Sequence, residues 1–504
     1  MKKNERKTGV LLHITSLPSD YGIGDLGKEA YAFVDSLVEN KISLWQILPT
    51  GPTGFGDSPY ASRSAFAGNE LFISPERLYL DGYLDLDDVR KKAHETERVD
   101  YSASRDFKMP LLFKAAKRFL KEKNKEYKEY LAFRREESSW LEDYALFQAL
   151  CSKYNDSRWY LCWDKDLRRR DEKALLKAMK EEKEIVDIYT VLQYFFFSQW
   201  AKLKEYANGK GLEIIGDIPI FIASDSSDAW AHPELLMIDQ DGQQEAGSGV
   251  PPDAFSSTGQ LWGNPLYRWE EHEKTGFDWW IKRIKASLRL CNIIRIDHFR
   301  GFEAYWQIPA GETTAMNGKW VKGPGQKFFD AIKKALGDDL PIIAEDLGVI
   351  TPEVEKLRDD NNLPGMKILQ FAFGFDDSGK FDTSNAYLPH NCGYQSVAYT
   401  GTHDNNTTVG WYRSLDDRSK DYVRRYLECA DQDVLWRAIR ALMMCHSKWV
   451  IFPMQDILGL DESARMNVPS TCGTSNWSWK MNRDDINSPS FAGIKYYSEL
   501  YGRA

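Results

Sequence analysis

The sequence predicts a (β/α)8 barrel, an α/β fold in which eight parallel strands alternate with helices. Eight short apolar runs, rich in β-branched residues, are spread along the 504 residues. Segments with helical spacing of apolar residues lie between most of them. Continuous apolar strands that alternate with helices are typical of a parallel sheet buried on both faces. The catalytic groups of such barrels lie at the C-terminal ends of the strands.

The expected strands follow one another at intervals along the chain. They are 9–18, 42–52, 212–221, 292–299, 341–348, 366–373, 396–404 and 448–458. Most of these runs end in polar or small residues, as "ISLWQILPTGP" and "PIIAEDLG" do. Helical periodicity marks 27–40, 278–290, 325–337, 353–360 and 417–446. The first run, "GVLLHITSLP", breaks at His13 and is too short for a signal peptide, so we interpret it as the first strand.

A minimal barrel takes about 250 residues, so about half of this chain must be insertion. Residues 65–195 are rich in Lys, Glu, Leu and Ala, and "SWLEDYALFQALCSKY" has apolar residues at helical spacing. We expect a mostly helical insertion there. Residues 239–267 are rich in Gly, Pro, Ser and Asp, which favours an active-site loop over a passive surface loop. We expect one catalytic domain over 1–504, with no all-β domain after the eighth strand.

Composition narrows the classes of function. The net charge of −9 argues against a nucleic-acid partner, and no apolar run approaches the roughly 20 residues of a membrane helix. Seven cysteines without a CxxC pair indicate reduced thiols and a cytoplasmic protein. Seventeen tryptophans suit either a large aromatic core or a site where sugar faces stack on rings. Composition does not separate these two.

Charged residues interrupt the apolar run "NIIRIDHF". Residues two apart share a face of a strand, so Arg295 and Asp297 point the same way and His298 points away as a structural residue. We expect the guanidinium to lower the pKa of Asp297 and keep it ionised, which suits a nucleophile. The alternative is a buried ion pair that only fixes packing.

Other expected strands also end in acidic residues. Glu345 and Asp346 end "IIAEDLG", His403 and Asp404 end "YTGTHDN", and Asp217 ends "IIGDIPI". Converging carboxylates indicate a glycosidase-type site or a divalent-metal site. No HxH or HExxH spacing and no GxxxxGK[ST] motif is present, so we expect no metal and no cofactor.

Several segments resemble those of one family. "RIDHFRG", "AEDLG" and "TGTHDN" are similar to signature segments of the 4-α-glucanotransferases, the amylomaltases or disproportionating enzymes of glycoside hydrolase family 77. The likeness extends to "GDSPYASRSAFAGN", "GDIPIF", "PPDAFSSTGQLWGNPLY" and "ARMNVPST", and so spans nearly the whole chain.

The resemblance implies roles for individual residues. Asp297 would be the nucleophile, Glu345 the general acid/base, and Asp404 the carboxylate that stabilises the transition state. The substrate contacts that it implies are Ser58, Tyr60, Asp217, Asp253, Gln260, Trp262, Arg295, His403 and Asn467.

The implied reaction is retaining transfer of α-1,4-glucan segments between maltooligosaccharides and α-1,4-glucans. Such a mechanism needs two carboxyl groups about 5–5.5 Å apart, one ionised and one protonated. We expect the neighbouring carboxylates to raise the pKa of Glu345. Three alternatives stay open at this point: an α-1,4-glucan hydrolase with the same carboxylates, a catalytically silent glucan-binding protein, and a metal-dependent barrel enzyme.

Overall fold

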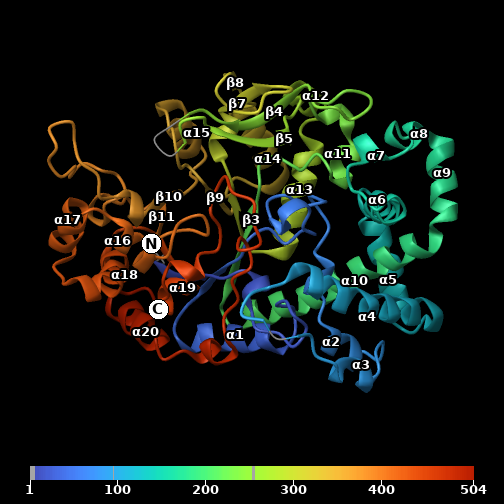
Figure 1. Cartoon of the computed structure of the whole chain (residues 1–504), viewed down its shortest axis with the longest axis horizontal. Helices are drawn as coiled ribbons and strands as arrows, with labels where there is room; N and C mark the ends of the chain where they lie inside the picture. The colour runs from blue at the N-terminus through green and yellow to red at the C-terminus, as the bar shows by residue number, and fades with distance from the viewer. Residues whose placement is uncertain (1–5, 95, 253–255) are drawn as a thin grey trace.

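The computed structural model describes residues 6–94, 96–252 and 256–504, and it contains the predicted barrel (Figure 1). Eight parallel strands close on themselves in chain order, β1, β2, β3, β6, β9, β10, β11 and β12. Their bounds are β1 Lys7–Leu11, β2 Leu44–Gln46, β3 Glu213–Ile218, β6 Ile293–Ile296, β9 Ile342–Ala344, β10 Gly365–Ile368, β11 Ser396–Tyr399 and β12 Trp449–Pro453. Each overlaps one of the eight predicted runs, so the fold class is confirmed.

Helices cover the outside of the barrel and bury one apolar stripe each. In α14, for example, Phe328 and Ile332 lie one helical turn apart, and both are fully buried together with Phe329. The helices outside the large insertion are α1 Lys28–Glu39, α11 Ser227–Ala231, α12 Trp269–Lys274, α13 Asp278–Leu290, α14 Gln326–Leu336, α15 Pro352–Asp360, α16 Thr408–Ser414, α17 Asp417–Leu427, α18 Val434–Met444, α19 Met454–Ile457 and α20 Phe491–Leu500. No described helix is long and apolar enough to cross a membrane.

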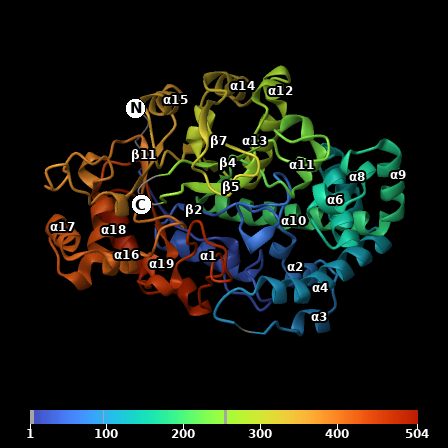
Figure 2. The ribbon, with the colours of Figure 1, turned by 45° about the horizontal axis from the view of Figure 1, so that its top comes forward.

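The connection between β2 and β3 is helical and lies on one side of the barrel (Figure 2). It comprises α2 Pro75–Leu80, α3 Leu86–Arg90, α4 Tyr101–Glu122, α5 Tyr127–Glu136, α6 Leu141–Tyr154, α7 Trp159–Cys162, α8 Lys165–Arg168, α9 Glu172–Glu181 and α10 Lys183–Gly209. A buried ion pair ties it to the barrel, because Lys108 Nζ lies 3.1 Å from Asp25 Oδ2.

A second sheet lies outside the barrel. Its four antiparallel strands have the spatial order β5–β4–β7–β8, with β4 Ala246–Val250, β5 Gln260–Pro265, β7 Ala304–Pro309 and β8 Lys319–Lys322. Two of them fall within 239–267, which the sequence suggested was an irregular loop. Cross-strand pairing with β7 orders this Gly-rich segment, and such long-range pairing leaves little local signal. No strand follows β12 in the described residues.

Candidate active site

Arg295 joins two carboxylates at the C-terminal end of β6. Asp217 of β3 pairs with it in the strand register, and Arg295 Nη1 donates to both Asp217 oxygens at 2.8 and 2.7 Å. Arg295 Nη2 donates to Asp297 Oδ1 at 3.0 Å, so Arg295 and Asp297 share a face as predicted. The Asp217 side chain is 0% exposed, whereas that of Asp297 is 30% exposed. Asp297 therefore opens to the cleft, and Asp217 stands behind it.

Arg295 lowers the pKa of Asp297, as predicted, but the net shift of this pKa is upward. Burial raises the pKa of Asp297 to about 6, and the attraction of Arg295 offsets this only in part, because Asp217 and Asp404 add negative charge nearby. The sequence showed the guanidinium but not the loss of water around the carboxyl group. Asp297 is nevertheless mostly ionised at neutral pH.

Glu345 follows β9 and is held by two backbone amides. His298 N–H donates to its Oε2 at 2.6 Å and Leu347 N–H donates to its Oε1 at 3.0 Å. Burial raises the pKa of Glu345 to about 8, with a further contribution from the charge of Asp297. The pKa of Glu345 is raised, as predicted, although burial contributes more to this rise than the neighbouring carboxylate does. Burial and the charge of Asp297 therefore both favour the protonated form of Glu345.

His298 does not follow strand alternation, and the prediction that it faces away is wrong. β6 ends at Ile296, and His298 has the left-handed backbone conformation, with φ 52°. This turn gives its amide to Glu345 and sets its ring edge-on to Trp262, with centroids 4.8 Å apart. Burial lowers the pKa of His298 to about 3, so the ring is neutral at the cleft.

Asp404 is the third carboxylate of the cleft. Asn467 Nδ2 donates to its Oδ1 at 2.7 Å, and His403 Nε2 lies 3.4 Å from its Oδ2. Burial raises the pKa of Asp404, but His403 and the hydrogen bond from Asn467 outweigh burial and bring the pKa to about 2. Asp404 is a fixed negative charge at neutral pH.

Tyr60 connects the Asp404 side of the cleft to the Asp217 side. Its hydroxyl donates to Asp217 Oδ2 at 2.8 Å, and its ring stacks on His403 with centroids 5.0 Å apart. Burial and the charge of Asp217 raise the pKa of Tyr60 well above 10, so it remains a donor. Trp477 adds a third ring, 5.8 Å from Tyr60 and 5.9 Å from His403.

The remaining predicted residues lie on loops. Ser58 Oγ accepts from Tyr60 N–H at 3.2 Å and so shapes the turn that presents Tyr60. Trp262 Nε1 donates to Gln260 Oε1 at 3.2 Å, and both side chains belong to β5. Asp253 lies outside the described residues.

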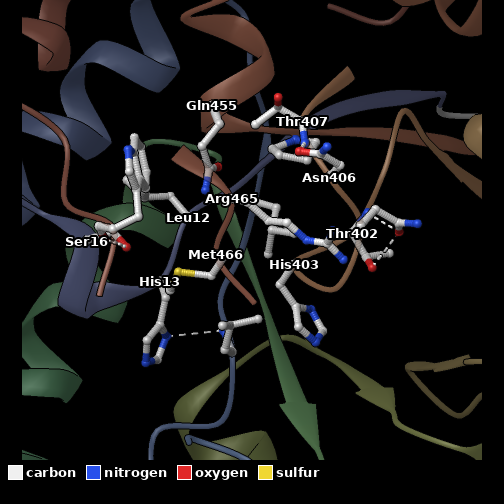
Figure 3. A pocket seen from close by; sticks show the side chains of 15 residues that line it. Leu12, His13, Ser16, Thr402, His403, Asn406, Thr407, Gln455, Arg465 and Met466 are labelled. Carbon is white, nitrogen blue, oxygen red and sulfur yellow. Dashed lines mark hydrogen bonds between the residues drawn. The ribbon is translucent and has the colours of Figure 1, made fainter. Parts of the chain in front are cut away.

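Within the loop at 463–479, the sequence pointed to the segment "ARMNVPST" and to Asn467, but not to roles for Arg465 and Trp477. Arg465 Nη2 donates to the Asp404 carbonyl at 2.6 Å, and its Nε donates to the Asn467 carbonyl at 2.7 Å. Arg465 also lines a pocket next to His403, with His13 on the other side (Figure 3). The excess of tryptophan hinted at aromatic contacts, but no spacing pointed to Trp477.

The helical insertion supports this loop from outside. Tyr101 Oη donates to the Trp477 carbonyl at 2.9 Å, and Val99 N–H donates to the Ser478 carbonyl at 2.7 Å. Arg98 Nη1 donates to Ser478 Oγ at 3.2 Å. The segment that precedes and begins α4 therefore holds the loop that carries Asn467 and Trp477.

No group of three or more His, Cys, Asp or Glu side chains is arranged to hold a metal ion in residues 6–94, 96–252 and 256–504. The described cleft offers acid, base and hydrogen-bonding groups instead. A carboxyl that keeps its proton and an adjacent carboxylate are the two groups that retaining glycoside chemistry requires.

Comparison with known proteins decides the family. The family model described as 4-alpha-glucanotransferase, of glycoside hydrolase family 77, matches residues 12–486. The chain belongs to this family. A 4-alpha-glucanotransferase of Synechocystis sp. is 48% identical over 99% of this chain and 98% of its own length. The one from Thermus thermophilus is 46% identical over 99% of both chains.

Solved structures agree with the family assignment. The amylomaltase of Streptococcus agalactiae, in complex with acarbose, has a TM-score of 0.94 and 42% identity, covering 99% of this chain and 100% of the other. The chain is thus a glucan-transferring enzyme of the amylomaltase type, with the fold and activity that its sequence segments predicted.

Proposed function

We propose that Asp297 is the nucleophile of this 4-alpha-glucanotransferase, that Glu345 is its general acid/base, and that Asp404 stabilises the transition state. The observation that carries this is geometric: the backbone amide of His298 links Glu345 to the residue after Asp297, so the two buried carboxyl groups lie together at the cleft. Burial raises the pKa of both groups, and the charge of Asp297 further favours the protonated form of Glu345, whereas Arg295 favours the ionised form of Asp297. The hydrogen bond from His298, the residue after Asp297, holds Glu345 next to the nucleophile.

The first half-reaction cleaves the donor. Asp297 attacks the anomeric carbon and forms a glycosyl ester, while the Glu345 proton moves to the departing glycosidic oxygen. The donor's reducing-end segment leaves with that proton. Asp404 is ionised and faces the cleft, where it accepts sugar hydroxyls and offsets positive charge that develops on the ring.

The second half-reaction builds the new bond. Glu345 is now a carboxylate and takes the proton from the 4-hydroxyl of an acceptor glucan or glucose. The acceptor oxygen attacks the anomeric carbon and releases Asp297. Because both steps invert the same carbon, the α-configuration is retained.

The other candidate residues have supporting roles in this proposal. Arg295 and the buried Asp217 fix the orientation of Asp297, while Tyr60, His403, Asn467 and Trp477 form the wall around the sugar bound there. The ring of Trp262 lies over His298, where Trp262 and Gln260 limit the entry of water. Ser58 acts through the turn that presents Tyr60, and Asp253 is the remaining proposed substrate contact.

We further infer that the substrates are maltooligosaccharides and α-1,4-glucans, and that the enzyme is cytoplasmic. All seven cysteines are free thiols, which suits a reducing compartment. The amylomaltase that shares this fold holds acarbose in its structure, which supports an oligosaccharide ligand.

Incubation with maltotriose tests the proposal. We expect glucose together with oligomers longer than maltotriose, resolved as a ladder by chromatography. Asp297→Asn should remove the ladder, and Asp278→Asn, an exposed carboxyl on α13, is the matched control. Glucose and maltose without longer products would instead identify a hydrolase.

A further inference from the structure

Exposed apolar side chains lie outside the catalytic groups, on the β7–β8 hairpin and on the loop before α15, and Arg300 contacts both segments. Trp320, Met316 and Val349 are 39%, 57% and 51% exposed. We call these three residues the Trp320 surface. Exposed large apolar groups gathered in one place mark an interaction site more often than single exposed side chains do.

The Trp320 ring is held in place from behind. The Arg300 guanidinium lies 3.7 Å from the ring centroid, and Trp306 of β7 packs edge-on against the ring with centroids 5.2 Å apart. Trp306 is anchored in turn by its Nε1–H, which donates to the Ala315 carbonyl at 2.9 Å. A flat ring with restricted rotation can stack on a ligand at a low cost in conformational entropy.

The same arginine joins the Trp320 surface to the catalytic loops. Arg300 is buried, lies three residues after Asp297, and donates from Nη1 to the Val349 carbonyl. Val349 lies four residues after Glu345. In Figures 1 and 2, β7 and α15 lie on the same side of the barrel. Arg300 therefore links the Trp320 surface to the segments that follow Asp297 and Glu345.

The proposed mechanism indicates which sugars of the substrates lie on the Glu345 side of the cleft. Glu345 protonates the departing oxygen and later deprotonates the incoming one, so the leaving and acceptor sugars lie on its side. Asp404, His403 and Tyr60 lie on the side of the sugar that Asp297 holds.

The chemistry of the surface fits a sugar chain. A pyranose offers an apolar face to a ring and hydroxyls to polar groups around it. Next to the apolar surface, Asn317 is exposed and Glu312 is half-buried on the hairpin loop, and Asn317 Nδ2 donates to Glu312 Oε2 at 3.1 Å. These amide and carboxylate groups supply both donors and acceptors for hydroxyls.

We propose that the Trp320 surface binds the distal sugars of an acceptor α-1,4-glucan and so favours long acceptors over glucose. The inference rests on the proposed roles of Asp297 and Glu345. The surface lies beyond the sugar that reacts, so it adds affinity only when the acceptor is long enough to reach it.

Acceptor-length kinetics test the proposal. The donor is held constant, and kcat/KM is measured with maltoheptaose and with glucose as acceptors. We expect Trp320→Ala to lower the ratio of these two values by about fivefold to tenfold, where tenfold corresponds to about 1.4 kcal/mol. Trp320→Phe keeps a ring over Arg300 and should retain most of the ratio.

Two further variants distinguish a loss of contacts at the Trp320 surface from a folding defect. Val349→Asn changes the surface and keeps the backbone carbonyl to which Arg300 donates, and it should lower the ratio in the same direction. Tyr496→Ala removes an aromatic side chain of α20 that is more exposed than Trp320, at 60%, and should leave the ratio unchanged.

The outcomes separate the two proposals. Equal losses with both acceptors, or an unchanged ratio, would overturn the glucan surface while leaving the catalytic roles intact. A wild-type dimer that Trp320→Ala converts to a monomer, with an unchanged ratio, would assign the surface to a second copy of the chain instead. Absence of transfer to glucose by the wild type would contradict the proposed function itself.

Discussion

The backbone amide of His298 donates a 2.6 Å hydrogen bond to Glu345 Oε2, which ties the residue after the nucleophile to the acid/base. Main-chain geometry, rather than two independent side-chain rotamers, therefore sets how the two carboxyl groups face each other. The left-handed conformation of His298 makes this possible, and such a backbone geometry is uncommon outside glycine.

The pH dependence of kcat/KM should be bell-shaped. The acid limb reports ionisation of Asp297, with a pKa of about 6, and the alkaline limb reports loss of the Glu345 proton, with a pKa of about 8. Steady-state rates with maltotriose from pH 4 to 10 check this, and an alkaline limb that persists unchanged in Glu345→Gln would contradict the assignment.

Removing the Asp217 carboxylate should shift the acid limb of the pH profile of kcat/KM. Its charge contributes to the raised pKa of Asp297, so Asp217→Asn should shift the limb to lower pH. Arg295 then has one ionised partner instead of two, and we expect kcat to fall by roughly tenfold or more because Asp297 is less well oriented. Asp35→Asn, at an exposed carboxyl that contacts Lys210, is a control for the pH profile. An acid limb that moves to higher pH would contradict this electrostatic account.

Glu345 should also affect stability in a pH-dependent way. Its pKa is raised in the folded protein, so the folded state binds more protons than the unfolded state between about pH 4.5 and 8, and the carboxyl destabilises the fold increasingly as pH rises. Relative to the wild type, the Tm of Glu345→Gln should therefore rise between pH 5 and 8, by on the order of 4 °C. Calorimetry measures this, with Glu355→Gln on the exposed face of α15 as control. A Tm difference between Glu345→Gln and the wild type that does not change with pH would contradict the raised pKa of Glu345.

The helical insertion should influence catalysis through Tyr101. Tyr101→Phe removes the hydrogen bond to the Trp477 carbonyl, which loosens the loop that carries Asn467. We expect kcat to fall by about threefold to tenfold, since one buried hydrogen bond contributes about 0.5–1.5 kcal/mol. The control is Tyr130→Phe, whose hydroxyl bonds Thr190 Oγ1 within the insertion, 2.8 Å away. Equal kcat losses in both variants, in step with equal losses of Tm, would indicate a general effect on stability.

The sequence predicts the barrel because its strands are buried on both faces and therefore stay apolar along their whole length. It also places Arg295 and Asp297 on one face, since strand alternation fixes that relation. Strand alternation fails at His298, where the strand has already ended, and the sequence does not show this end. The pKa of Asp297 and the support of the 463–479 loop by Tyr101 depend on burial and on contacts between residues far apart in the chain. Local patterns do not carry that information.

Trapping the glycosyl-enzyme tests the central claim most directly. Glu345→Gln lacks the base for the second step, whereas a glycosyl fluoride donor needs little acid assistance in the first, so the ester should accumulate. Quenching in acid, followed by proteolysis and mass spectrometry, should find the added sugar on Asp297. Sugar attached to Asp217 or Asp404, or fluoride release without any adduct, would contradict the assignment of Asp297 as nucleophile.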